Sequence, residues 1–256
     1  MLINQLETAT DQDCIIGLLR SLSQKLGFTQ FRMIFIFPSS IQRPEVRIFN
    51  NCSAEWVKTY EKRHFFAVDP VVRKGMTQST PILWAHIIEK CRAEEDQAGL
   101  EVMQQAQEAG LQDGITLPWH GAFGHVGLLS WITSSAHTKH QWLTIAPFLN
   151  WLAVHVFESL SRGCLYKHSS HEALSLREVE VCQWAAEGKQ VSDIAKILDI
   201  TPRTVTFHLN RVIEKLGASS KSQAISWVIK KGLVRLNIAA ARIENVDSRG
   251  GTLGYM

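Results

Sequence analysis

Side chains that can bind DNA alternate with apolar residues over residues 201–216. Thr201 and Pro202 are typical of a helix start, because threonine caps well and proline lacks only an N–H that would be unbonded there. Apolar residues recur after them at helical spacing. The positions between are polar or basic: Arg203, Thr204, Thr206, His208, Asn210 and Arg211. A helix with one apolar face and one hydrogen-bonding face, placed after a short helix and a tight turn, suits the major groove of DNA.

The charge distribution is consistent with this interpretation. The net charge is +3, and residues 172–236 hold ten Lys and Arg against seven Asp and Glu, so the whole excess lies in the segment with this helix. On charge alone, a solvated helix face explains the pattern as well as a phosphate-binding surface does. Thr206 and Asn210 face the bases by helical position, and asparagine can form two hydrogen bonds with an adenine edge. The candidate phosphate contacts are Lys189, Arg203, Arg211 and Lys215.

A second group of polar side chains lies in apolar surroundings in the N-terminal half. Asp69 interrupts the apolar run FFAVDPVV, and Trp56 and Tyr60 are four residues apart on one face of a helix that Ser53 can cap. Asp69 before Pro70 is also a simple helix cap, and two aromatic residues on one helix face are commonly core residues. On these residues alone, a binding pocket and a purely structural role both remain open.

The elements that must position these residues follow from hydrophobic periodicity. Helices are expected over 11–26, after Ser53, after Asp69, within 84–110 and over about 138–160. Strands are expected at FRMIFIF, VRIFN, GITLPWHG and HVGLLSWITS, the last two joined by a glycine-containing turn as a hairpin. Strands flanked by helices on both sides imply an α/β/α sandwich around an antiparallel sheet, and hence the α+β class. The C-terminal segment predicts an all-α, four-helix helix-turn-helix domain.

These elements divide the chain into four parts. Residues 1–160 form the expected α+β domain, and the polar, aperiodic stretch 161–174 is the expected linker. Residues 175–236 form the helix-turn-helix domain, and 237–256 is expected to be a flexible tail.

Composition excludes several other classes of protein. The five cysteines are scattered and odd in number, which argues against a disulfide framework and indicates a cytoplasmic protein. The N-terminus lacks the pattern of a signal peptide, and the apolar run 142–157 is too short for a membrane span, so no membrane is expected. His168 and His171 have no partner at metal-ligand spacing, and no nucleophile motif is present. We therefore expect no metal, no cofactor and no enzymatic activity.

The C-terminal segment closely resembles the helix-turn-helix domain of the LuxR type. The matching positions are Arg177, Glu178, Trp184, Gly188, Lys189, Ile194, Ala195, Leu198, Ile200, Thr201, Thr204, Val205, His208, Lys215 and Leu216. The N-terminal half resembles the autoinducer-binding domain of quorum-sensing receptors of this type. It carries that domain's pattern at Trp56, Tyr60, Asp69, Pro70, Pro81, Trp84 and Gly114. Together these patterns favour a ligand pocket over separate structural roles.

The resemblance implies an N-acyl homoserine lactone, or a related signal, as the ligand. It assigns the ligand amide N–H to Asp69, the lactone carbonyl to the Trp56 indole and the acyl carbonyl to the Tyr60 hydroxyl. It also places Val71, Trp84, Thr116 and Ser130 in the pocket. One position departs from the family pattern: Cys52 stands where a tyrosine is common, and a thiol cannot replace the reach or strength of a phenolic donor.

The resemblance further implies a homodimer that binds an inverted repeat in double-stranded DNA, with half-sites about 10 bp apart. The 138–160 helix would pair the ligand domains, and Ala224, Trp227 and Val228 would pair the DNA-binding domains. RNA polymerase is a further candidate partner, and the choice between activator and repressor stays open. The alternatives are an orphan regulator of this type that senses a different small molecule, a response regulator, and an enzyme that turns over acyl lactones.

Overall fold

The computed structural model describes residues 12–37, 43–121, 124–168, 173–230, 232–234, 245–246 and 252–253. The chain divides into two compact units, unit 1 (Met1–Ser170) and unit 2 (His171–Met256), and each is described by itself. The predicted tail, 237–256, lies outside the described residues except for the short antiparallel pair of β6 (Asn245–Val246) and β7 (Thr252–Leu253).

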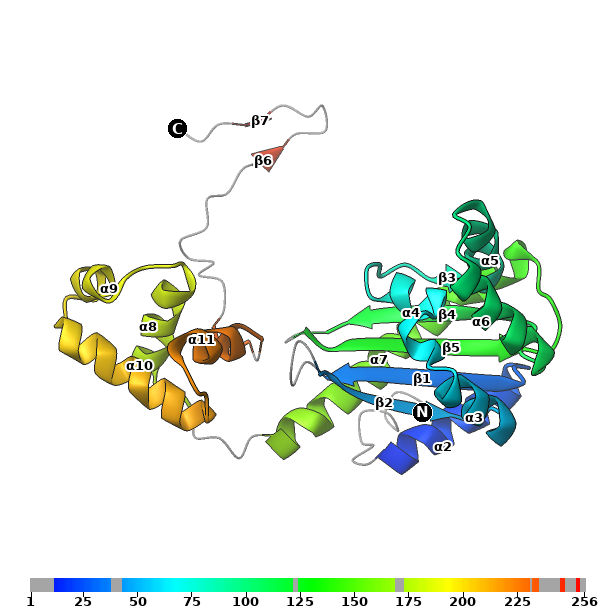
Figure 1. Cartoon of the computed structure of the whole chain (residues 1–256), viewed down its shortest axis with the longest axis horizontal. Coiled ribbons are helices and arrows are strands. Elements are labelled where there is room, and N and C mark those ends of the chain that lie inside the picture. Colours follow the sequence, from blue (N-terminus) through cyan, green and yellow to red (C-terminus); the bar gives the residue numbers. More distant parts are fainter. Residues whose placement is uncertain are drawn as a thin grey trace. The chain divides into compact units, whose positions relative to one another are not determined.

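Unit 1 is built on a five-stranded antiparallel sheet with strand order β2-β1-β5-β4-β3. The predicted β4–β5 hairpin is present, with Asp113 opposite Thr133 and His120 opposite Val126. Helices cover both faces of the sheet (Figure 1), so the predicted α/β/α sandwich with an antiparallel sheet is confirmed. The strands are β1 (Gln30–Phe37), β2 (Glu45–Asn50), β3 (Ile82–Leu83), β4 (Asp113–His120) and β5 (Val126–Thr133).

One face of the sheet packs against α2 (Gln12–Lys25) and α7 (Lys139–His168). Side chains alternate along each strand, so every second residue of β1, β4 and β5 points into this aromatic-rich core. At Gly127 an added Cβ would lie 2.5 Å from the Phe157 ring, so the glycine permits the close approach of α7 to β5. The largest fully buried side chains here include Phe31, Phe35, Trp131, Trp142 and Phe157.

Helix α7 differs from its prediction at one end. It continues to His168, into the segment 161–174 that the sequence marks as a linker. By length and composition its stretch Lys139–Ser161 could cross a membrane. In the structure, however, its inner residues Leu149 and Leu152 are fully buried in the core of unit 1. Its start is tied to β4, because the Trp142 indole N–H donates to Asp113 Oδ2 (2.9 Å).

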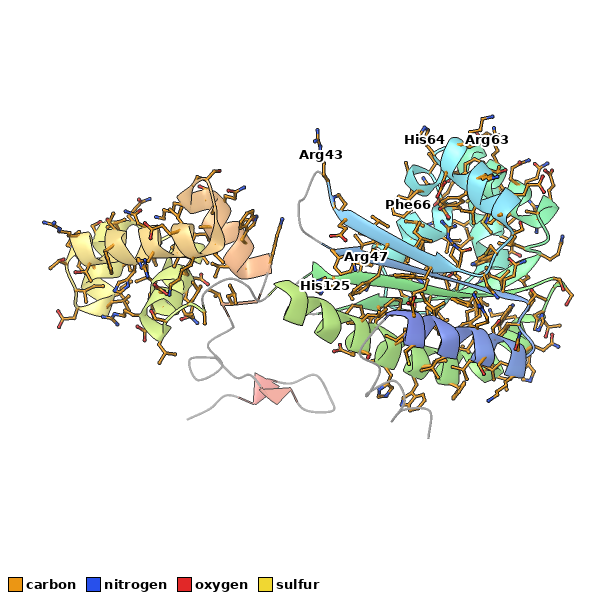
Figure 2. The ribbon with its side chains drawn as sticks, turned by 90° about the horizontal axis from the view of Figure 1, so that it is seen from below. Arg43, Arg47, Arg63, His64, Phe66 and His125 are labelled. Carbon is orange, nitrogen blue, oxygen red and sulfur yellow. The ribbon has the colours of Figure 1, made fainter. Side chains whose placement is uncertain are left out.

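Five short helical segments cover the opposite face of the sheet. They are α3 (Ala54–Lys62), η1 (Phe65–Ala67), α4 (Pro70–Gly75), α5 (Trp84–Ala93) and α6 (Gln97–Glu108). Ser53 caps α3 and Asp69 caps α4, as the sequence predicts. Figure 2 shows Arg63 and His64 on the outer side of this layer, with Phe66 closer to the sheet. The layer therefore acts as a lid over this face.

Besides the β6–β7 pair, the described part of unit 2 consists of four helices. They are α8 (Leu176–Ala186), α9 (Val191–Leu198), α10 (Pro202–Leu216) and α11 (Lys221–Lys230). Thr201 caps α10 and Pro202 is its first residue, as predicted. Asp199 adopts the left-handed conformation (φ 52°) and ends α9, while the Arg177 guanidinium donates to the Leu198 carbonyl (2.7 Å). The left-handed Asp199 and the hydrogen bond from Arg177 to Leu198 define the tight turn that separates α9 from α10.

Candidate functional site

Asp69 is held at the start of α4 by three hydrogen bonds. Its Oδ1 accepts from the backbone N–H groups of Val71 (2.8 Å) and Val72 (3.3 Å), and its Oδ2 accepts from the Tyr60 hydroxyl (2.7 Å). The residue is only 7% exposed. The carboxylate of Asp69 therefore has partners within the chain. The backbone N–H groups at the start of α4 and the Tyr60 hydroxyl satisfy this carboxylate, so its burial does not require a hydrogen bond from a ligand.

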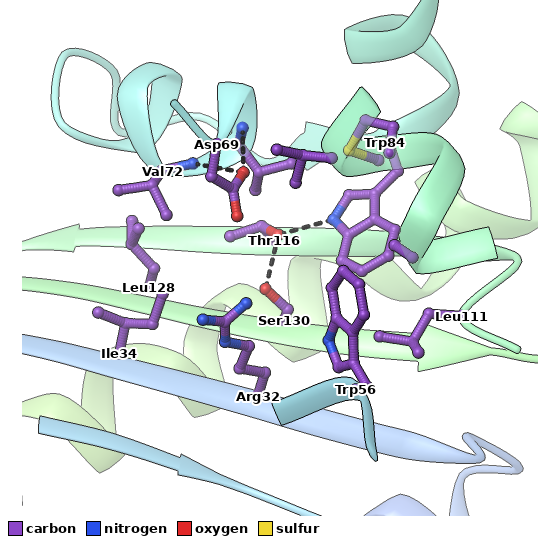
Figure 3. Close-up of a pocket in the computed structure, with 14 residues that line it drawn as sticks. Arg32, Ile34, Trp56, Asp69, Val72, Trp84, Leu111, Thr116, Leu128 and Ser130 are labelled. Carbon is purple, nitrogen blue, oxygen red and sulfur yellow. Dashed lines mark hydrogen bonds between the residues drawn. The ribbon is translucent and has the colours of Figure 1, made fainter. Parts of the chain in front are cut away.

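A row of polar side chains crosses the sheet beneath Asp69. Arg32 on β1 lies directly opposite Ser130 on β5 and Asn50 on β2, and Ser130 lies opposite Thr116 on β4. Because residues paired across strands share a face, the four side chains belong to the lid side of the sheet. Figure 3 shows Arg32, Ser130 and Thr116 in the floor of the cavity, with Asp69 on the opposite side.

The hydroxyl groups of Thr116 and Ser130 form a chain of hydrogen bonds that begins at the Trp84 indole. The Trp84 indole N–H donates to Thr116 Oγ1 (3.0 Å), and Thr116 Oγ1 lies 2.8 Å from Ser130 Oγ (Figure 3). The two hydroxyl groups share one hydrogen bond but carry two protons. One hydroxyl proton therefore remains for a further acceptor in the cavity.

Trp56 and Tyr60 on α3 face the same cavity from the lid. Their rings meet edge to face, with centroids 5.6 Å apart, and both residues are buried. Within the described chain, the Trp56 indole N–H donates to no other residue. Burial, and then the nearby Asp69 carboxylate, raise the pKa of Tyr60 far above its ordinary value, and Arg32 lowers it by less. Tyr60 therefore keeps its proton, which it donates to Asp69.

The cavity between lid and floor has a volume of about 30 Å³, which is room for water but far less than a ligand pocket of the usual size. Six residues that the sequence places in the pocket line it: Trp56, Asp69, Val71, Trp84, Thr116 and Ser130. Tyr60 borders an adjoining cavity instead. Sequence reasoning missed several lining residues, namely Arg32, Ile34, Val72, Val102, Met103, Ala106, Leu111 and Leu128. Arg32 had a detectable signal, since it is the single charged residue in FRMIFIF.

Cys52 borders the adjoining cavity, which has a volume of about 100 Å³ and also contacts Arg32, Trp56 and Tyr60. Burial raises the pKa of the Cys52 thiol to about 11, and Arg32 opposes this only in part. The thiol is therefore neutral at pH 7 and is a weak donor. No group of three His, Cys, Asp or Glu side chains that could hold a metal ion occurs within the described residues.

In unit 2 the polar face of α10 is exposed, as the sequence predicts. Arg203, Thr206, Asn210 and Arg211 are exposed, whereas Val205, Leu209, Val212 and Leu216 pack inside. Phe207 is 58% exposed on the same helix and was not among the predicted contacts. Lys189 is exposed in the turn before α9, and Thr204 is half-buried with its hydroxyl 2.8 Å from that of Thr201. This face offers hydrogen-bonding, basic and apolar groups together.

Lys215 is not part of that exposed face, which corrects its prediction as a phosphate contact. Its ammonium donates to Glu178 Oε2 (2.9 Å) and to the Ala173 carbonyl (3.0 Å). The two side chains of the ion pair are 11% and 6% exposed. Burial raises the pKa of Glu178, but the hydrogen bonds from Lys215 and the Ser175 N–H outweigh it, so the pKa is lowered. The pair ties α8 to α10 and so fixes the helix that carries the exposed face.

Two of the predicted dimer contacts on α11 are also corrected. Ala224 and Val228 are buried in the core of unit 2, against Cys182 and Val212, so they are not available to a second molecule. Trp227 is partly buried against the same core. Helical periodicity identifies the apolar face of α11. It does not show that this face packs against the core of unit 2 rather than against a second molecule.

The geometry defines a class of protein: an α/β domain with a small buried pocket, carried on one chain with a helix-turn-helix domain. Comparison with known proteins agrees. Residues 11–160 match the family described as autoinducer binding domain, and residues 172–228 match bacterial regulatory proteins of the luxR family. The chain belongs to the LuxR family of regulatory proteins with an autoinducer binding domain. It is a transcriptional regulator that takes a signal ligand, and not an enzyme.

Similar proteins cover almost the whole chain. The transcriptional activator protein AhyR of Aeromonas hydrophila is 36% identical over 241 residues, which are 93% of this chain and 92% of that protein. The transcriptional activator protein SolR of Ralstonia solanacearum is 33% identical over 232 residues, 89% of this chain and 94% of that one. Among solved structures, Escherichia coli SdiA has the same fold with a TM-score of 0.74 at 22% identity, covering 92% of this chain and 97% of SdiA.

The buried ion pair gives a first prediction. Replacing Lys215 with methionine leaves Glu178 charged and buried without its partner, so we expect unit 2 to lose about 3–5 kcal/mol of stability at pH 7. The folded-state pKa of Glu178 lies below its ordinary 4.5, so the pair's contribution is complete above that pH and is lost as the pH falls through the folded value. The stability gap between wild type and variant should therefore narrow in acid. Urea unfolding at a series of pH values measures both effects.

The control is Lys189→Met, because Lys189 is exposed and its replacement should change stability by less than about 0.5 kcal/mol. A Lys215→Met variant as stable as wild type would show that Lys215 is free to contact phosphate after all.

Proposed function

We propose that the chain is a cytoplasmic quorum-sensing transcription factor that binds an N-acyl homoserine lactone and, as a homodimer, an inverted-repeat promoter site in double-stranded DNA. The observation that carries this proposal is the cavity beneath Asp69. A carboxylate acceptor, the free Trp56 N–H and one spare hydroxyl proton at Ser130 or Thr116 converge there between apolar walls. An acyl lactone supplies one amide N–H, two carbonyl groups and an apolar tail to match them.

Each polar end of the ligand then has a partner. Asp69 Oδ accepts the amide N–H, because a carboxylate oxygen has capacity beyond the hydrogen bonds it already accepts. The Trp56 indole N–H donates to the lactone carbonyl, and Ser130 supplies the spare hydroxyl proton. Val71 and the Trp84 ring line the walls. The cavity must open to admit the ligand, since about 30 Å³ holds far less than a molecule of this size.

The exposed face of α10 is the proposed DNA-reading surface. Asn210 and Thr206 face the base edges, and Phe207 adds an exposed ring suited to apolar contact with a thymine methyl group. The phosphate contacts are Lys189, Arg203 and Arg211, with Thr204 at the start of the helix.

A second copy of the chain is the proposed partner for α7. Its outer side carries an apolar stripe of Leu143 (54% exposed), Phe148 (41%), Trp151 (40%) and Val154 (40%), with the Phe148 and Trp151 rings stacked 5.9 Å apart. Single exposed apolar residues are ordinary, but a row along one helix is typical of an interface. On α11 the exposed Ile229 takes the place of Ala224 and Val228 as the candidate dimer contact, beside Trp227.

The relatives named above are transcriptional activators, so activation, with RNA polymerase as the further partner, is the proposed mode of regulation. A second candidate function is an orphan regulator that senses a different small molecule. The neutral thiol of Cys52, in place of a phenolic donor, is the observation that favours it.

The ligand assignment predicts a selective gain in stability. An acyl homoserine lactone at one hundred times its Kd should stabilise the folded protein by about 2.7 kcal/mol, which raises the melting temperature of unit 1 by several degrees. We expect this shift for wild type with at least one acyl chain length. We expect a much smaller shift for Asp69→Asn, because its neutral amide oxygen is a weaker acceptor for the ligand N–H than a carboxylate. Differential scanning fluorimetry across chain lengths measures it.

The matched control is Asp13→Asn, because Asp13 is an exposed acid of unit 1 on α2. An unshifted wild type at every chain length would reject the lactone and leave the orphan regulator as the better assignment.

The DNA assignment predicts two different losses. Asn210→Ala should flatten discrimination at one base pair by about 1–3 kcal/mol and leave binding to random DNA nearly unchanged. Arg203→Ala should weaken specific and random DNA alike and reduce the slope of log K against log salt by about one unit. Fluorescence anisotropy over a range of salt concentrations distinguishes them. Equal losses on both kinds of DNA for Asn210→Ala would remove it from the base contacts.

A further inference from the structure

Arg32 is the one charged side chain on the floor of the cavity. It lies on β1 between Asn50 and Ser130, on the side of the sheet that faces the lid. Its guanidinium carbon is 3.7 Å from the centroid of the Tyr60 ring, and the side chain borders both the cavity beneath Asp69 and the adjoining cavity beside Cys52. The guanidinium therefore lies inside the proposed binding site.

The donors of Arg32 are largely unused. Within the described residues it forms no ion pair, and its guanidinium donates to the Tyr60 hydroxyl but to no carboxylate or carbonyl oxygen of the protein. The Asp69 carboxylate already accepts from Tyr60, Val71 and Val72. A guanidinium has five N–H donors, and removing them from water without acceptors is costly. The site is consequently suited to a ligand that brings an acceptor to Arg32.

The acyl carbonyl is the part of the proposed ligand with fewest donors, because only the single hydroxyl proton at Ser130 or Thr116 is left for it and a carbonyl oxygen can accept two hydrogen bonds. Tyr60 has a single hydroxyl proton, and it is directed to Asp69. Cys52 offers only a neutral thiol, which is a weak donor. Of the residues around the two cavities, Arg32 combines a strong donor with a position next to both Tyr60 and Cys52.

We propose that Arg32 donates a hydrogen bond to the acyl carbonyl oxygen of the ligand, and so replaces the phenolic donor missing at Cys52. This inference rests on the proposed function and assigns one more ligand contact to it. A trans amide is planar, and its N–H and C=O point in opposite directions. Asp69 is on the lid and Arg32 on the floor, on opposite sides of the cavity (Figure 3). An amide held between them can meet both at once, and the adjoining cavity of about 100 Å³ gives the guanidinium room to adjust.

The test compares two ligands that differ only at this oxygen. The probes are N-hexanoyl homoserine lactone and its thioamide, in which sulfur, a much weaker acceptor, replaces the acyl carbonyl oxygen. Isothermal titration calorimetry on the full chain should show wild type binding the amide at least about tenfold more tightly than the thioamide, since hydrogen bonds to charged groups are among the stronger ones. Arg32→Met should bind the two ligands with similar, reduced affinity.

Three further variants make the result decisive. Arg32→Lys retains a charged donor and should recover part of the discrimination, which a residue that only fills space would not do. Arg20→Met on α2 is the control for loss of an exposed arginine and should discriminate as wild type does. If the methionine variant fails to fold, as judged by its melting curve, Arg32→Gln takes its place in the same comparison.

The outcomes are distinguishable. Wild-type discrimination in a folded Arg32→Met or Arg32→Gln variant would overturn the role of Arg32 and leave the proposed function intact. Absence of binding by the wild type to acyl lactones of every chain length would overturn the proposed function, and this inference with it.

Discussion

The need to satisfy buried polar groups governs unit 1. A five-stranded sheet that is covered on both faces has little access to water, so each polar side chain inside it must find a partner. Most of them do so within the chain. Trp84, Thr116 and Ser130 form one connected set, and Tyr60 with the start of α4 satisfies Asp69. Outside the pocket, Gln30 Oε1 and the Trp131 indole N–H are buried without a hydrogen-bond partner in the described part of the chain. The groups that remain within the pocket are donors: the Trp56 N–H, one hydroxyl proton and most of the Arg32 guanidinium. A pocket with this surplus is complementary to a ligand rich in carbonyl oxygens.

The same principle shapes unit 2, with a different result. Its buried charges, Lys215 and Glu178, are paired with each other and hold α8 against α10. Arg203, Thr206, Asn210 and Arg211 of α10 lie on the outside instead, where DNA can reach them. Lys215 supports the helix from within, whereas Arg203 and Arg211 lie on its exposed side, where Arg211 pairs with Glu214 (3.3 Å). Sequence spacing alone places all of them on α10 and does not separate these two roles.

The fold was largely predictable from the sequence, because it depends on local signals that add up. The cap at Thr201–Pro202, the Asp69–Pro70 cap and the period-two pattern of the β4–β5 hairpin each specify their element without reference to the rest of the chain. The helix ends were harder to predict: α7 runs past Ser161 to His168 and through Gly163, although glycine commonly ends a helix. The direction in which α11 turns its apolar face depends on packing against α8 and α10, which periodicity cannot supply.

The pocket was predictable in its members but not in its internal bonding. Family-like spacing identified Trp56, Asp69, Trp84, Thr116 and Ser130, all of which line one cavity. That Tyr60 donates to Asp69, and that Arg32 lies opposite Ser130, depend on strand register and on the position of α3 over the sheet. Both are long-range features, and they change which groups are left for a ligand.

The central claim is that an acyl lactone accepts hydrogen bonds from the surplus donors in the pocket of unit 1. The most direct test is mass spectrometry of the small molecule that co-purifies with the full chain from cells supplied with a mixture of N-acyl homoserine lactones. The account predicts close to one lactone per chain, enriched for particular acyl lengths over the mixture supplied. A different compound in that stoichiometry, or folded protein that retains no lactone from the mixture, would contradict it.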